Sequence, residues 1–199
     1  MPALEPALAW TPSRALVTVM MTDVVASTAR AVALGDGRWR EVVESHDRIA
    51  RATIATFRGR YVKSLGDGLL ATFDSPACAI ASAQAFRDAL SKLNLSVRIG
   101  LHTGNVEFLG DDIIGVTVNI TGRICAAAGG NEILVSGTVR DLMGAPTPQF
   151  CDRGTHRLKG IPDWWALYAL CGDRTRSRGH ERPANAGRWS EYQRSARLL

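Results

Sequence analysis

The tripeptide Gly66-Asp67-Gly68 restricts the fold of this 199-residue chain more than any other feature, because it separates two segments with the composition of β-strands. Residues 61–64 lie before it, and residues 69–73, an apolar run, lie after it. Asp-Gly is among the commonest sequences of tight hairpin turns, since both residues tolerate the backbone conformations that such turns need. The sequence therefore predicts a β-hairpin with Asp67 at its tip.

Strands and helices follow one another in the rest of the chain. Apolar runs predict strands at 15–22, 97–102, 106–109, 132–135 and 165–171, and two shorter ones near Gln149 and Arg157. Helical spacing, together with start and stop residues, predicts helices at 35–57, from Ser75-Pro76 onward, from about Gly115 to Gly129-Gly130, and after Ser136. This order indicates an α+β fold, in which one sheet has helices packed on one face.

The composition changes near both ends. Residues 1–14 contain three prolines and are expected to form a lead-in to a domain at 15–171. The seven arginines and three acidic residues of segment 172–199 give it a net charge of +4, which leaves +1 of the overall +5 for residues 1–171. We expect this segment to be a basic, flexible tail. A nucleic-acid-binding protein is disfavoured, because the charge belongs to the tail and not to the domain.

The four cysteines, Cys78, Cys125, Cys151 and Cys171, are scattered and form no CxxC pair. A zinc site is therefore not expected, and we predict reduced thiols in a cytoplasmic protein. The N-terminal residues lack the basic start and apolar run of a signal peptide. No apolar run in the sequence has the length needed to span a bilayer.

Two aspartates stand where they could bind metal. Asp23 follows a predicted strand and precedes the tight segment 24–28, whose backbone N–H groups could hold phosphate oxygens. Asp67 stands at the hairpin tip. Two carboxylates and a phosphate chain would suit Mg²⁺, which binds few protein ligands. Each residue also has a purely structural explanation, Asp23 as a helix cap and Asp67 as a turn former.

Three further polar residues have a regular placement. Asn119 and Arg123 are four residues apart, which puts both side chains on one helix face. Lys63 is a charged residue within an otherwise apolar strand. A solvated helix face would explain the first two, and an edge strand would explain Lys63.

Five segments together resemble, in order and spacing, the class III adenylyl/guanylyl cyclase homology domain. They are MTDVVAST (21–28), GRYVKSLGDGLLATF (59–73), VRIGLHTGNV (97–106), DIIGVTVNITGR (112–123) and RLKG (157–160). The resemblance covers residues 17–170 and implies a ferredoxin-like βαββαβ core with extra strands. Two places depart from the family pattern. Met21 stands where an aromatic residue is common, and Thr121-Gly122 replaces a small apolar pair.

The resemblance also implies roles for individual residues. Asp23 and Asp67 match the aspartates that hold two Mg²⁺ or Mn²⁺ ions. Lys63 and Asp112 match the pair that recognises the purine in adenylyl cyclases. Asn119 and Arg123 match the residues that orient the ribose and stabilise the transition state. The residues that match phosphate-binding positions are Arg98, Lys159 and, in the segment after Asp23, Thr28.

The implied function is an adenylyl cyclase that converts ATP to 3′,5′-cyclic AMP and pyrophosphate. The resemblance implies a head-to-tail homodimer, in which one chain gives the metal aspartates of a site and its partner gives Lys63, Asp112, Asn119, Arg123 and Lys159. A guanylyl cyclase is the alternative within the same enzyme class. A catalytically silent nucleotide-binding domain with a regulatory role is the alternative outside it.

Overall fold

The computed structural model describes residues 13–144 and 148–171. The predicted basic tail and residues 1–12 of the predicted lead-in lie outside these ranges, so the domain boundaries remain predictions. The described strands are β1 (Ser13–Val24), β2 (Arg60–Ser64), β3 (Leu69–Phe73), β4 (Val97–Leu109), β5 (Asp112–Ile114), β6 (Ile133–Ser136), β7 (Phe150–His156) and β8 (Trp165–Leu170). The helices are α1 (Ser27–Leu34), α2 (Asp36–Thr56), α3 (Pro76–Ser91), α4 (Val116–Ala127) and α5 (Gly137–Asp141).

The strands form one sheet in the order β2-β3-β1-β4-β6-β8-β7, with β5 paired to β4. The first four strands of the chain pair antiparallel in the order β2-β3-β1-β4, and helices connect β1 to β2 and β3 to β4. This is the predicted ferredoxin-like core, and it includes the predicted hairpin β2–β3. The later strands extend the sheet beyond β4.

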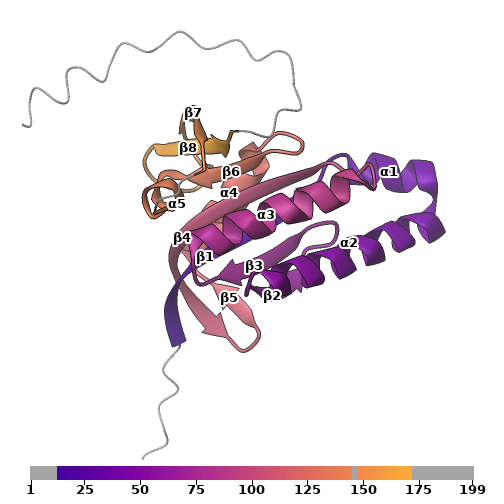
Figure 1. The fold of residues 1–199 in the computed structure, drawn as a ribbon, viewed down its shortest axis with the longest axis horizontal. Coiled ribbons are helices and arrows are strands. Elements are labelled where there is room, and N and C mark those ends of the chain that lie inside the picture. The colour runs from indigo at the N-terminus through magenta and orange to yellow at the C-terminus, as the bar shows by residue number, and fades with distance from the viewer. Residues whose placement is uncertain (1–12, 145–147, 172–199) are drawn as a thin grey trace, which may run out of the picture.

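Helices cover both faces of the sheet, so the expectation that they pack on one face is wrong. Helices α2 and α3 lie side by side over one face (Figure 1), where Met20, Ile99 and Phe86 share a core cluster. Helix α4 packs on the opposite face, against Val17, Val19 and their neighbours through Val118 and against β6 and β8 through Ile124. We call this second side the α4 face. Its helix is short, which makes its packing hard to infer from periodicity alone.

The strands predicted at 97–102 and 106–109 are not separate, because β4 is a single strand from Val97 to Leu109 with no turn at 103–105. Twelve residue pairs join it to β1, from Val97 opposite Val24 to Phe108 opposite Ser13. Gly104 is needed there for close packing, since a Cβ on it would lie 2.5 Å from Thr117 Oγ1 of α4. The strands predicted near Gln149 and Arg157 are likewise one strand, β7.

The prediction that all four cysteines are reduced is wrong, because Cys151 and Cys171 form a disulfide between β7 and the residue after β8. The register explains the pairing, since Cys151 lies opposite Ala169, two residues before Cys171. Cys78 and Cys125 are free thiols. Cytoplasmic location stays a prediction. Within residues 13–144 and 148–171, no helix combines the length and apolar composition that crossing a bilayer requires.

Helix α4 lies very close to the sheet at Gly100 of β4. A Cβ at this position would lie 2.4 Å from the backbone nitrogen of Cys125 and 2.8 Å from the carbonyl oxygen of Thr121. Both atoms belong to the backbone of α4 and cannot move aside as a flexible side chain could. The absence of a side chain at Gly100 therefore sets the distance between the helix and the sheet.

We predict that Gly100→Ala lowers the free energy of unfolding by about 1–3 kcal/mol, because the added methyl group overpacks this contact. Gly37→Ala is the matched control, since nothing lies within 4 Å of a Cβ there and alanine favours the helix. Urea denaturation followed by circular dichroism measures both. An unchanged stability of Gly100→Ala would mean that α4 shifts freely and that the close contact has no structural role.

Candidate functional site

The sheet brings Asp23 and Asp67 to the same region. Asp23 is the penultimate residue of β1, and Asp67 lies in the turn of the β2–β3 hairpin, which Leu65 N–H closes with a 2.9 Å bond to Gly68 O. The hairpin presses against β1 here, because a Cβ on Gly68 would lie 1.9 Å from the carbonyl oxygen of Thr22. Glycine at 68 therefore permits the approach that puts the two carboxylates together.

The electrostatics of Asp23 reflect this proximity. Burial raises the pKa of its carboxyl group, the negative charge of Asp67 raises it further, and Arg98 lowers it. In the described part of the chain, no three His, Cys, Asp or Glu side chains form a group able to hold a metal ion. A pair of mutually repelling, partly exposed carboxylates instead fits Mg²⁺, which takes one or two protein carboxylates and completes its shell with phosphates and water.

Arg98 lies on β4 directly opposite Asp23 in the β1–β4 register. Its Nη1 atom is 3.3 Å from Asp23 Oδ2, so the two form an ion pair. Thr28 is exposed in the first turn of α1. The N-cap residue of that helix, Ala26, has a left-handed φ of 55° and makes no side-chain capping bond. Two of the three predicted phosphate-binding residues, Arg98 and Thr28, are thus close in space or in sequence to Asp23.

Lys63 and Asp112 form a second group. Lys63 Nζ on β2 is 2.5 Å from Asp112 Oδ2 on β5, and both side chains are more than a third exposed. The bond from Lys63, helped by the Ile113 N–H, lowers the pKa of Asp112 and holds it as a carboxylate. The predicted purine pair is therefore in contact, although its members are 49 residues apart.

A β-bulge precedes Lys63. The β2–β3 register shifts between Tyr61 and Lys63. Tyr61 packs on the side of α2 and α3, whereas Val62 packs on the α4 face with Ile113 of β5. Regular alternation would return Lys63 to the side of Tyr61. The bulge turns its ammonium group toward β5 instead.

Helix α4 carries the third group. Asn119 and Arg123 are both exposed, while Ile120 and Ile124 of the same helix are buried. Arg123 Nε donates a 3.1 Å hydrogen bond to the carbonyl oxygen of Lys159, in the loop between β7 and β8. The guanidinium is thereby held at one edge, and no residue of ranges 13–144 and 148–171 occupies its other N–H groups, which can bind an anion. The Lys159 side chain is also exposed.

The three groups share one side of the sheet. Val17, Val19 and Met21 of β1 point to the α4 face, and Asp23 continues this alternation. Met21 Sδ lies 3.2 Å from where a Cβ on Gly122 would be, so two of the positions that depart from the family pattern face each other. Within the described ranges, no hydrogen bond or ion pair joins one group to another. The site residues are thus divided among separate places on one face.

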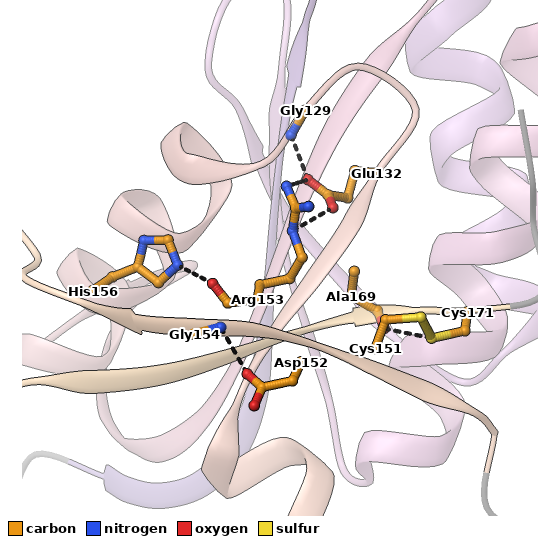
Figure 2. A network of polar contacts seen from close by, with 9 residues as sticks. All are labelled: Gly129, Glu132, Cys151, Asp152, Arg153, Gly154, His156, Ala169 and Cys171. Carbon is orange, nitrogen blue, oxygen red and sulfur yellow. Dashed lines mark hydrogen bonds and ion pairs between the residues drawn. A yellow bond between two sulfur atoms is a disulfide. The ribbon is translucent and has the colours of Figure 1, made fainter. Parts of the chain in front are cut away.

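Sequence reasoning missed the network that fixes the β7–β8 hairpin to the end of α4 (Figure 2). Arg153 of β7 pairs with Glu132 at 3.1 Å, and Glu132 Oε2 accepts a 2.7 Å bond from the N–H of Gly129, just after α4. His156 bonds the Arg153 carbonyl oxygen at 2.9 Å. These contacts support the loop that holds Arg123, and no sequence motif signals them.

His102 lies within β4 and has a structural role. Its Nδ1 atom is 2.8 Å from Ser136 Oγ, and its ring contacts Trp165 edge-on. Burial lowers its pKa to about 4, so the ring is neutral at pH 7. These contacts connect β4, β6 and β8 inside the fold.

The chain is similar both to other protein sequences and to solved structures. An uncharacterized protein of Mycobacterium tuberculosis is 30% identical over 177 residues, which cover 80% of this chain and 57% of the relative. The chain thus spans just over half the length of this curated relative. Among solved structures, the adenylyl cyclase CyaB from P. aeruginosa matches with a TM-score of 0.74 at 21% identity, covering 83% of this chain and 98% of that one.

A guanylate cyclase domain from Catenaria anguillulae, solved in complex with GTP, matches with a TM-score of 0.71 at 17% identity, covering 78% of this chain and 96% of that one. The fold is therefore common to cyclases of both purines. The family described as the adenylate and guanylate cyclase catalytic domain matches residues 11–172, which is most of the sequence. The chain belongs to the adenylate and guanylate cyclase catalytic domain family.

Proposed function

We propose that the protein is an adenylyl cyclase, which converts ATP to 3′,5′-cyclic AMP and pyrophosphate. The contact between Lys63 and Asp112 is the observation that carries this choice. Adenine offers the N6 amino group as a donor and N1 as an acceptor. Asp112 would accept a hydrogen bond from N6, and Lys63 would donate one to N1. Guanine reverses both roles, because its O6 is an acceptor and its N1–H is a donor.

The reaction requires the ribose 3′-oxygen to attack the α-phosphorus and to expel pyrophosphate. Asp23 and Asp67 would hold two Mg²⁺ or Mn²⁺ ions, which supply charge neutralisation for the triphosphate and for the 3′-oxygen. Arg98, Lys159 and the N–H groups near Thr28 would bind phosphate oxygens. These residues position and neutralise the substrate, as phosphoryl transfer generally requires.

Residues of α4 would act on the transition state. The bond from Arg123 Nε to the Lys159 carbonyl leaves the rest of its guanidinium for the charge that develops on the α-phosphoryl group. Asn119 is one turn earlier on the same exposed face and would orient the ribose. Both side chains are exposed before substrate binds, which fits a site completed by a second surface.

We propose further that the active sites form between two chains in a head-to-tail homodimer. Support comes from the separation of the groups, since no polar contact links the Asp23–Asp67 pair to the Lys63–Asp112 pair among the described residues. Each chain carries both halves, so a symmetric pair would build two equivalent sites. Lys63 and Asp67 would then serve different sites, although four residues separate them.

The first prediction concerns the reaction and its metal ligands. The purified chain is expected to form cyclic AMP from ATP with Mg²⁺ or Mn²⁺, and to form less cyclic GMP from GTP, with products identified by mass. Asp67→Ala is expected to remove nearly all of this activity while the domain stays folded, because one carboxylate of the metal pair is lost. Normal turnover by the folded variant would contradict the two-metal assignment, and absence of both products from the wild type would contradict the function.

The second prediction concerns the purine. Combining Lys63→Glu with Asp112→Ser reverses the polarity offered to the base and is expected to lower the ATP-to-GTP activity ratio by about tenfold or more. The control is Arg60→Gln with Asp111→Asn, which removes the neighbouring 3.2 Å ion pair between the same parts of the fold. The control should keep the wild-type ratio. An unchanged ratio in the first variant would mean that Lys63 and Asp112 do not touch the base.

The third prediction tests the shared site by mixing two inactive variants, Asp23→Ala and Asn119→Ala. In a mixed dimer, one site carries both defects and the other carries neither. With free exchange at equal amounts, half of the dimers are mixed, so activity should recover to about a quarter of the wild-type value. Tagged pull-down verifies the exchange. Exchange without recovered activity would mean that each site is built within a single chain.

A further inference from the structure

The ion pair between Arg98 and Asp23 competes with metal binding at Asp23. Asp23 Oδ2 accepts from Arg98 Nη1 at 3.3 Å, and Asp67 lies close enough to raise the pKa of Asp23 through its charge. The cluster therefore holds two carboxylates and one guanidinium. A guanidinium stays protonated in proteins, so Arg98 cannot relieve a conflict by losing its charge. A divalent cation on Asp23 would be repelled by this fixed positive charge.

The backbone of Arg98 is fixed, while its side chain is free to turn. Arg98 pairs with Asp23 of β1, the next residue, Ile99, pairs with Ile133 of β6, and the carbonyl oxygen of Arg98 accepts from Cys125 Sγ at 3.6 Å. The Arg98 side chain is 37% exposed, and the Asp23 side chain is 44% exposed. Release of Asp23 therefore needs only a rotation of the Arg98 side chain toward solvent, where an anion can reach it.

We infer that Arg98 is a built-in counter-cation, which occupies the Asp23 carboxylate until a triphosphate draws it away. Metal and Arg98 then compete for Asp23, and phosphate and Asp23 compete for Arg98. Metal and nucleotide consequently favour each other's binding, because each releases the group that the other needs. This inference rests on the proposed function for the phosphate role of Arg98, and it adds a binding order that disfavours metal alone.

The first arm of the test measures Mn²⁺ alone, by electron paramagnetic resonance of the free ion and without nucleotide. Arg98→Gln should bind Mn²⁺ about tenfold more tightly than the wild type, within the usual range of coupling between sites. Arg38→Gln is the control, because it removes the same charge from an exposed position on α2. Equal or weaker Mn²⁺ binding by Arg98→Gln would overturn the inference, as would an equal gain in Arg38→Gln.

The second arm measures nucleotide without metal, using 3′-deoxy-ATP in the presence of a chelator. This compound lacks the attacking hydroxyl group, so no turnover interferes. Asp23→Asn frees Arg98 and should tighten binding severalfold, whereas Asp67→Asn removes the same charge nearby and breaks no bond to Arg98. If both variants bound 3′-deoxy-ATP equally more tightly, the change in net charge alone would explain the effect, and the inference would be overturned. Neither arm scores activity, so a wild type that forms no cyclic nucleotide would refute the proposed function separately.

Discussion

The antiparallel pairing of β1 with β4 is the interaction on which the rest of the structure depends. Twelve residue pairs connect the two strands, and β3, β5 and β6 all join the sheet through one or the other. The pairing also decides the chemistry of the site, because it sets Asp23 opposite Arg98. Successive side chains of these strands point to opposite faces of the sheet. One set forms the core under α2 and α3, and the other forms the surface on which α4 packs.

Close packing between neighbouring elements is the second requirement, and three glycines permit it because they have no side chain. Gly100 and Gly104 let α4 lie against β4, and Gly68 lets the hairpin tip reach β1. Each contact involves an element that carries a proposed functional group. The close packing of the fold and the position of these groups therefore have the same origin, and a methyl group at any of the three would disturb both.

Much of this could be predicted from the sequence, for reasons that differ between elements. The Gly-Asp-Gly hairpin, the Ser75-Pro76 helix start and the Ser136 cap are local signals, and the structure confirms them. The predicted break in β4 was wrong because Thr103-Gly104-Asn105 has turn composition, whereas long-range pairing with β1 decides its conformation. The disulfide was missed for a similar reason, since only the β7–β8 register brings Cys151 and Cys171 together. The contact of Lys63 with Asp112 was expected from family resemblance, and no local pattern would have given it.

The bulge before Lys63 has a consequence for how this domain tolerates change. A perfectly paired β2–β3 hairpin would gain a regular ladder and would aim the lysine at the side of α2. The irregularity thus gives up regular pairing between β2 and β3 and places Lys63 beside Asp112. Regular pairing of residues 61–64 with β3, with no residue removed, would set Lys63 opposite Leu69 on the side of α2 and would separate it from Asp112 of β5. Deletion of Val62 would instead keep Lys63 opposite Leu70 on the α4 face, so the number of residues in β2 decides on which face of the sheet the lysine lies.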